Sequence, residues 1–299
     1  MPAPALLMML LASATAPAFA QPATPAARTA PARPSPPVGA IVKLDSGMTL
    51  DYVVQGDPRG EVLLLLHGAG DSWHSWDRVM PLLPATYRVY AITQRGHGRS
   101  DHPATGFHRD DFASGVRGFL SKLGIKKVTI VGHSLGSLIA QAVAEQDTAG
   151  AIARVVLIGS GPGVRDGQVR EAISSPFAGL KDPIDYTFAR DFQMSTIHHP
   201  VPALFAELMI GEAMKVPAAT WHGLAEFHAE TRRADELKAI KAPTIIFWGD
   251  QDSIFTRADQ DVLTSMIPRA KLHVYKDTGH ALHWERPREF VADLLRDLR

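Results

Sequence analysis

The chain has 299 residues, of which 45% are hydrophobic and 21% charged, so it can bury one large core or two modest ones and is neither disordered nor fibrous. Lys plus Arg equals Asp plus Glu at 31 each, a balance that offers no electrostatic attraction to nucleic acid or to an anionic membrane. The sequence contains no cysteine, which excludes disulfides, thiolate nucleophiles and Cys-ligated metals.

The amino terminus has the features of an export signal. Residues 1–20 contain an apolar run from Leu6 to Ala12 and end in Ala18-Phe19-Ala20, the small-x-small pattern that signal peptidase cuts. The run is shorter than the ~20 residues of a transmembrane helix, so we expect cleavage before Gln21, no integral membrane association afterwards, and a periplasmic or secreted protein. Because the segment lacks Lys and Arg, an uncleaved anchor or a misassigned start codon stays open. Residues 21–37 are mainly Pro and Ala and predict an extended linker.

Residues 38–299 alternate strand-like and helix-like patterns. The predicted strands are 40–44, 48–54, 62–66, 87–92, 128–131, 154–158, 244–248 and 271–275, and the predicted helices include 112–123, 138–144, 258–266 and 288–298. The first two strands are separated by Asp45-Ser46-Gly47, which predicts a hairpin, whereas 62–66 is continuously apolar, as in a central parallel strand. We therefore predict an α/β fold with a mostly parallel, doubly wound sheet and functional groups beyond the carboxyl ends of its strands.

One segment interrupts this alternation. Between Gly161 and Ala242 no strand-like run occurs, and prolines divide the segment into helical stretches. This pattern predicts a helical insertion at about 165–240 that leaves the sheet at a carboxyl-end loop and covers the site as a cap. Its apolar side chains pack between helices or line an apolar pocket, and they include Phe188, Phe192, Met194, Leu204, Phe205, Leu208, Met209, Ile210, Met214, Trp221 and Phe227.

A serine-containing turn follows the strand 128–131. Gly132-His133-Ser134-Leu135-Gly136 lies between that strand and the helical run 138–144. A side chain at either glycine position of such a turn would collide with the neighbouring strand or helix, and the strained turn exposes the serine hydroxyl. A serine here can also simply cap the following helix. The strand-turn-helix context favours a nucleophile elbow with Ser134 as the nucleophile.

A serine nucleophile needs a base, and the base needs an acid that orients it. Two carboxylates, Asp250 and Asp252, follow the strand 244–248. We assign the acid to Asp252, because Asp250 comes directly after a glycine and is better placed to brace the turn. Asp166 is a further candidate.

The base is assigned to His280, which follows the strand 271–275 in Asp277-Thr278-Gly279-His280. His283 lies nearer the last helix and is a weaker candidate. The order Ser, Asp, His along the chain is the order of an α/β sheet with a nucleophile elbow. The other histidines, including His198-His199 in the insertion, lack a ligand spacing such as His-x-x-x-His beside an acid, so we expect surface or core residues and no metal.

Two backbone amides are candidates for an oxyanion hole. Leu135 directly follows the nucleophile at a helix amino end, and Ala69 lies in the loop after His67-Gly68. The alternative for that loop is a plain turn that ends the strand. Further along it, Asp71 or Ser72 is expected to cap a helix that carries two tryptophans.

Together these motifs resemble the α/β-hydrolase superfamily, in the branch of serine esterases, lactonases and carbon–carbon bond hydrolases with a helical cap. The resemblance covers about residues 38–299 and rests on His67-Gly68-Ala69-Gly70, Arg95-Gly96-His97-Gly98-Arg99-Ser100, Gly132-His133-Ser134-Leu135-Gly136, Trp248-Gly249-Asp250-Gln251-Asp252, and Gly279-His280 with Glu285-Arg286-Pro287. The family pattern places an Asp two residues before Arg95, where this chain has Thr93. This departure concerns the bonds that hold the loop in place and not the triad. The resemblance also implies that haloalkane dehalogenases and epoxide hydrolases of this fold use an Asp nucleophile, and Ser134 argues against both.

The sequence therefore predicts a serine hydrolase that cleaves an ester or lactone of a small to medium, largely apolar molecule, without a cofactor. Ser134, His280 and Asp252 form its triad, and the amides of Leu135 and Ala69 its oxyanion hole. The same machinery serves amide, thioester and carbon–carbon bond hydrolysis and cofactor-free perhydrolysis. A non-catalytic ligand-binding protein is the alternative from another class. The sequence predicts no nucleic-acid partner and leaves the oligomeric state open.

Overall fold

A computed structural model describes residues 34–163, 175–229 and 234–299. The expected signal segment, most of the Pro/Ala-rich linker and Asp166 lie outside these residues, and the first two stay predictions. Among the described helices, none has the length and apolar character needed to cross a bilayer.

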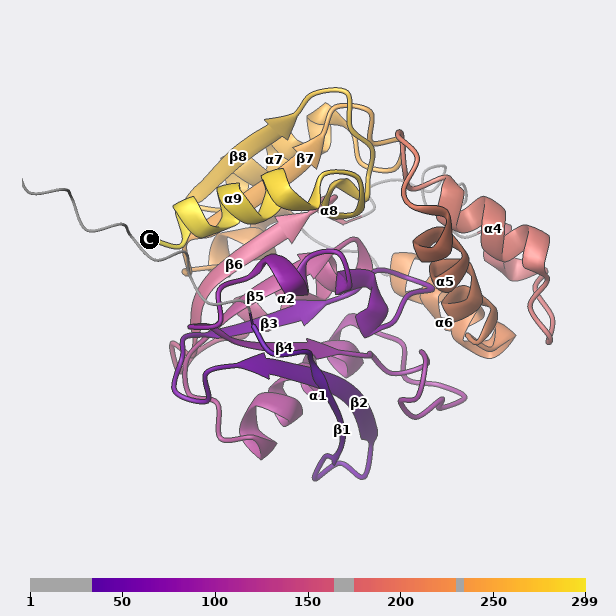
Figure 1. Ribbon diagram of the computed structural model, residues 1–299, viewed down its shortest axis with the longest axis horizontal. Coiled ribbons are helices and arrows are strands. Elements are labelled where there is room, and N and C mark those ends of the chain that lie inside the picture. The colour runs from indigo at the N-terminus through magenta and orange to yellow at the C-terminus, as the bar shows by residue number, and fades with distance from the viewer. Residues whose placement is uncertain (1–33, 164–174, 230–233) are drawn as a thin grey trace, which may run out of the picture. The chain divides into compact units, whose positions relative to one another are not determined.

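An eight-stranded sheet organises the described residues (Figure 1). Its strands are β1 (Val38–Lys43), β2 (Thr49–Gly56), β3 (Val62–Leu66), β4 (Arg88–Ile92), β5 (Val128–His133), β6 (Ile152–Ile158), β7 (Thr244–Gly249) and β8 (Ala270–Tyr275). Their order is β1-β2-β4-β3-β5-β6-β7-β8. The β1/β2 and β2/β4 pairs are antiparallel and the remaining pairs are parallel. The predicted fold class and the predicted hairpin at one edge are confirmed.

The central strands are buried on both faces, which explains their continuous apolar sequence. Successive side chains of a strand point to opposite faces of the sheet, so Leu64 and Leu66 of β3 enter one core while Leu63 and Leu65 enter the other. The first core is covered by α1 (Arg109–Lys122), α2 (Leu135–Glu145) and α7 (Arg257–Met266), and the second by α9 (Pro287–Asp297), which follows the short α8 (Leu282–Glu285).

The insertion between β6 and β7 is helical, as predicted. It contains α4 (Tyr186–Met194), α5 (Ala203–Met214) and α6 (Ala218–Ala229), which form a group set apart from the sheet in Figure 1. The rings of Phe177, Phe188, Phe192 and Trp221 pack together at centroid distances of 4.9–6.5 Å and form an aromatic cluster of the cap. Phe188, Phe192 and Trp221 therefore pack within the cap, whereas Phe205 and Met209 pack against Ala281 and Trp284, and Leu204 is exposed.

The expected helix after the β3 loop is a single 3₁₀ turn, Trp73–Trp76. Its cap is Ser72, whose hydroxyl accepts a hydrogen bond from the amide of His74 at 3.2 Å. Asp71, the other candidate cap, is buried, and its carboxylate accepts the Ser75 hydroxyl and the Gly68 amide instead of the first amides of the turn.

The turn between β5 and α2 is possible only because it contains two glycines. A Cβ at Gly132 would lie 2.2 Å from the carbonyl oxygen of Gly136, and a Cβ at Gly136 would lie 2.2 Å from the carbonyl oxygen of Leu66 on β3. Both neighbours are backbone atoms, which cannot rotate away. The end of β3 and the start of α2 therefore meet at van der Waals contact, as the sequence predicted.

Replacement of Gly136 by Ala should lower the free energy of unfolding by about 1–3 kcal/mol or more, because the added methyl overlaps the β3 backbone. The matched control is Gly115→Ala in α1, where an added Cβ meets nothing within 4 Å, and which should gain up to about 1 kcal/mol from helix propensity. Urea denaturation of both variants tests this prediction. Equal stability of the two would contradict the close contact at the turn.

Candidate active site

Ser134 occupies a strained and accessible position at the end of β5. Its backbone has φ 51°, in the left-handed region that residues other than glycine rarely adopt, and its amide donates to the carbonyl of Ile158 at 3.0 Å. From Val128 to Ala144 every residue is buried except Ser134, which is half-buried. The turn thus presents this serine at the surface of an otherwise buried segment.

Asp252 and His280 are brought together from the loops after β7 and β8. The Nδ1 atom of His280 lies 2.9 Å from Oδ2 of Asp252, and both side chains are buried. The other carboxylate oxygen of Asp252 accepts the amides of Ile254 and Phe255 at 2.8 and 3.0 Å, so the acid is fully hydrogen-bonded. The Nε2 atom of His280 is buried and has no hydrogen-bond partner among the described residues.

Ser134 and His280 line the same pocket. Its empty space is about 250 Å³, including the part open to solvent. The lining residues from the sheet side are Gly68, Ala69, Asp71, His133, Ser134, Ile254, His280 and Trp284, and those from the cap are Phe192, Gln193 and Thr196. The free Nε2 of His280 is thereby available to this pocket, although no hydrogen bond joins it to Ser134 in the part of the chain described, a looseness common in free enzymes.

The predicted oxyanion amides flank the same pocket. Leu135 is the first residue of α2, so its N–H has no partner within the helix, and Ala69 lies in the pocket wall. Neither amide donates a hydrogen bond elsewhere in the described residues.

Two buried histidines hold the Ala69 loop in place. His67 accepts the amide of Gln94 on Nε2 at 2.9 Å, so its Nδ1 carries the proton and donates to the carbonyl of Gly68 at 2.7 Å. His97 likewise accepts the amide of Gly70 on Nε2 at 3.2 Å and bonds the carbonyl of Arg95 through Nδ1. Burial lowers the pKa of His67 well below its usual value and that of His97 to about 4. Both imidazoles are therefore neutral at pH 7, and their hydrogen bonds hold the Ala69 loop against the loop that follows β4.

Asp71 is a buried carboxyl group of the pocket that the sequence analysis considered only as a helix cap. Its Oδ1 accepts Nε2 of Gln193 from the cap at 3.0 Å, and its Oδ2 accepts the Ser75 hydroxyl at 3.0 Å and the Gly68 amide at 3.2 Å. Burial raises the pKa of Asp71 to about 7, with the hydrogen bonds opposing this shift. Asp71 thus links the oxyanion loop to the cap.

Where the family pattern has an Asp, this chain has Thr93, and a neighbouring strand supplies the carboxylate instead. The Thr93 hydroxyl donates to the buried carboxylate of Asp51 on β2 at 3.3 Å, and the Ser100 hydroxyl donates to the Thr93 carbonyl at 2.6 Å. A carboxylate therefore contacts position 93 although it comes from another part of the sequence.

Asp250 and His283, the weaker candidates for acid and base, lie in other surroundings. Asp250 is exposed, and its Oδ1 accepts the amide of Asp277 at 2.7 Å, which joins the two loops after β7 and β8. His283 is fully buried against Trp76 and His133, and burial lowers its pKa well below the usual value.

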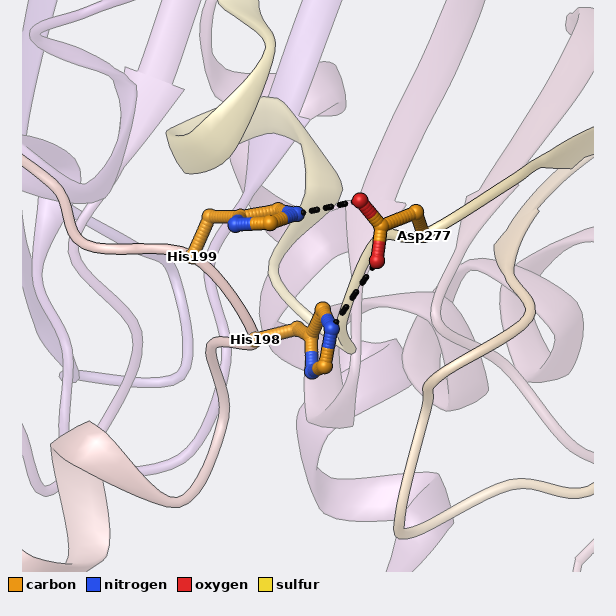
Figure 2. Close-up of side chains that lie close together, drawn as sticks. All are labelled: His198, His199 and Asp277. Carbon is orange, nitrogen blue, oxygen red and sulfur yellow. Dashed lines mark hydrogen bonds and ion pairs between the residues drawn. The ribbon is translucent and has the colours of Figure 1, made fainter.

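A second group of polar side chains lies outside the pocket. His198 and His199, from the loop between α4 and α5, both direct Nε2 at the carboxylate of Asp277 (Figure 2). The sequence analysis found no ligand spacing here, because the third member lies far along the chain and only the tertiary structure brings it near.

Comparison with known proteins identifies the family. The model of the alpha/beta hydrolase family matches residues 63–294, and the chain belongs to that family. A non-heme haloperoxidase from Rhodococcus erythropolis is 29% identical over 265 residues, covering 79% of this chain and 91% of that protein. A soluble epoxide hydrolase from Corynebacterium sp. is 36% identical over 273 residues, covering 83% and 92%. The structure of an esterase from Exiguobacterium antarcticum has a TM-score of 0.79 at 20% identity, covering 87% and 98%, a likeness of fold.

The raised pKa of Asp71 should make the free energy of unfolding of the wild type fall as the pH rises, and replacement by Asn should remove this dependence. Its pKa is higher in the folded protein than in the unfolded chain, so its contribution to the free energy of unfolding is greatest below about pH 4 and is lost as the pH rises to about 7. Between about pH 4 and pH 7 we expect the free energy of unfolding of the wild type to fall by a few kcal/mol relative to that of Asp71→Asn.

Urea denaturation at a series of pH values measures this difference. The control is Asp45→Asn, whose carboxylate is exposed and paired only with Lys122 at the surface. If the Asp71→Asn and wild-type curves run parallel, the buried carboxyl does not have a raised pKa.

Proposed function

We propose that this protein is a serine hydrolase that cleaves an ester or lactone bond of a small, largely apolar substrate through an acyl-enzyme intermediate. The observation that carries the proposal is the buried Asp252–His280 pair, whose free Nε2 belongs to the same pocket as the strained, accessible Ser134. Membership of the alpha/beta hydrolase family supports hydrolysis in general. The serine at the elbow supports acyl transfer rather than an Asp-nucleophile reaction.

In the proposed first step, Oγ of Ser134 attacks the substrate carbonyl while Nε2 of His280 takes the hydroxyl proton. The Nδ1–H of His280 donates to Asp252, which fixes the tautomer and stabilises the imidazolium that forms. The negative charge on the carbonyl oxygen is held by the amides of Leu135 and Ala69. His280 then returns the proton to the leaving alkoxide as the ester bond breaks. Water repeats the sequence on the acyl group and regenerates Ser134.

The surroundings of the pocket favour a small acyl group. Its empty space of about 250 Å³, part of it open to solvent, lies below the roughly 300–1,000 Å³ typical of ligand pockets. Phe192 and Ile254 supply apolar walls, while Gln193 and Thr196 of the cap supply polar groups that select orientation. Gln193 is held by Asp71, so the cap side of the pocket is pre-organised.

Hydrolysis of a series of p-nitrophenyl esters, from acetate to long acyl chains, tests the proposed function. We expect turnover that is highest for short chains and that is abolished in Ser134→Ala, because no other hydroxyl occupies the elbow. A fluorophosphonate probe should label Ser134 in the wild type. No turnover together with no labelling would overturn the proposal and favour a ligand-binding protein.

The two carboxylates after β7 should differ sharply in their effect on catalysis. Asp252→Asn should lower kcat by roughly 10⁴-fold, because the amide no longer favours the His280 tautomer that accepts a proton on Nε2. Asp250→Asn should stay close to the wild type, because the Asn side-chain oxygen still accepts the Asp277 amide. Steady-state kinetics on the best p-nitrophenyl ester measure both. A large loss of kcat in Asp250→Asn with little change in Asp252→Asn would mean that Asp250, and not Asp252, orients His280.

A further inference from the structure

His198, His199 and Asp277 form a three-residue cluster whose members come from two separate parts of the fold. Nε2 of His198 lies 3.1 Å from Oδ1 of Asp277, and Nε2 of His199 lies 2.8 Å from Oδ2 (Figure 2). The three donor atoms lie within 4.8 Å of one another. All three side chains are 40–65% exposed, so an ion in solution can reach them.

The backbone around the cluster is held in place by one carboxylate. Glu285 accepts the amides of His198 and His199 at 3.0 Å each and the amide of Gly279 at 2.9 Å. Through these three bonds it fixes the cap segment that carries the histidines against the loop that carries Asp277. A site whose ligands are already positioned loses little entropy when an ion binds.

The charge at the cluster is not balanced by a basic side chain. Within the described residues the Asp277 carboxylate is hydrogen-bonded to His198 and His199 and forms no ion pair with a Lys or Arg. The guanidinium of Arg286 is engaged with the main-chain carbonyls of Lys276 and Asp277 at 3.1 Å each. The neighbouring carboxylate of Glu285 adds negative charge, so the surroundings favour a cation.

We propose that His198, His199 and Asp277 bind a divalent transition-metal ion of the zinc class. Two imidazoles and one carboxylate suit Zn²⁺, Ni²⁺ or Cu²⁺, whereas Mg²⁺ and Ca²⁺ prefer oxygen ligands alone. Each neutral imidazole holds its proton on Nε2 when it donates to Asp277. Transfer of that proton to the solvent-facing Nδ1 leaves a lone pair on Nε2 for the metal. Small side-chain rotations then bring the three ligands to the ~2.0–2.2 Å distances of a zinc site, with water in the fourth position.

Such an ion would join the cap to the loop that carries His280. Asp277 precedes that histidine by three residues, and the two histidine ligands come four and five residues after the end of α4, which also carries Gln193 of the pocket. The ion touches none of the proposed reacting atoms. Its role is to fasten the cap to the sheet domain, and it does not depend on the proposed ester hydrolysis.

Isothermal titration of the full chain, without a polyhistidine tag, with ZnCl₂ tests the site. We expect one ion per chain in the wild type and no comparable binding of MgCl₂. His199→Ala and Asp277→Asn should each weaken zinc binding by about tenfold or more, because each removes one ligand or its charge. Asn tolerates the left-handed backbone of position 277, where φ is 53°, so this variant should fold.

The matched control is His102→Ala, an exposed histidine that lies outside the cluster. This variant should bind zinc as the wild type does, and so should Ser134→Ala. Hydrogen exchange gives a second measurement, in which zinc should slow the amides of His198, His199 and Gly279 in the wild type and leave them unchanged in His199→Ala. Absence of zinc binding, or equal binding by the wild type and both cluster variants, would overturn the proposal.

Discussion

Backbone-to-backbone contact at the carboxyl ends of the central strands is the constraint on which the rest of the site depends. The missing side chain of Gly136 lets α2 start against β3, and a Cβ at Gly249 would lie 2.2 Å from the carbonyl of Thr278. Gly159 is similarly close to His280, where a Cβ would meet its carbonyl at 2.7 Å. Because side chains are absent at these points, the loops that carry the serine, the acid and the histidine come within reach of one another.

The pocket that results is built largely from uncharged groups. Burial keeps His67, His97, His133 and His283 neutral at pH 7, since an unpaired imidazolium would cost several kcal/mol away from water. The buried side chain of Asp252 is satisfied by the amides of Ile254 and Phe255 and by the His280 ring. In such surroundings a hydrogen bond is stronger than in water, which would strengthen the bond that we propose from the Ala69 amide to an oxyanion.

Polar contacts as well as apolar packing tie the cap to the loops that carry Ala69 and His280. Gln193 bonds to Asp71 beside the oxyanion loop, and Glu285 bonds to the amides of His198 and His199 beside the His280 loop. The aromatic cluster of the cap also packs against the loop after β3, where a Cβ at Gly70 would lie 2.8 Å from the Trp221 ring. Phe205 and Met209 of α5 pack against Ala281 and Trp284 beside the His280 loop. Directional bonds of this kind set the position of the cap relative to the nucleophile, and an ion at His198, His199 and Asp277 would add one more.

The sequence by itself determined the sheet, because alternating strand and helix patterns with continuous apolar runs have few other solutions. It also determined where Ser134 and the helical insertion lie along the chain, since the two glycines of the turn and the prolines of the insertion act locally. The choice of Asp252 as the partner of His280 followed from local reasoning about the turn, and the structure places these two side chains in contact.

Only the tertiary structure decided the contacts between residues far apart in the chain. These contacts join residues far apart in the chain: 122 positions separate Asp71 from Gln193, 42 separate Asp51 from Thr93, and 79 and 78 separate His198 and His199 from Asp277. No short-range spacing marks such pairs, because the packing of the cap and of the sheet strands brings them together. The physical reason is that a strand or helix is specified by neighbouring residues, whereas a buried polar contact is specified by the three-dimensional arrangement of the whole fold.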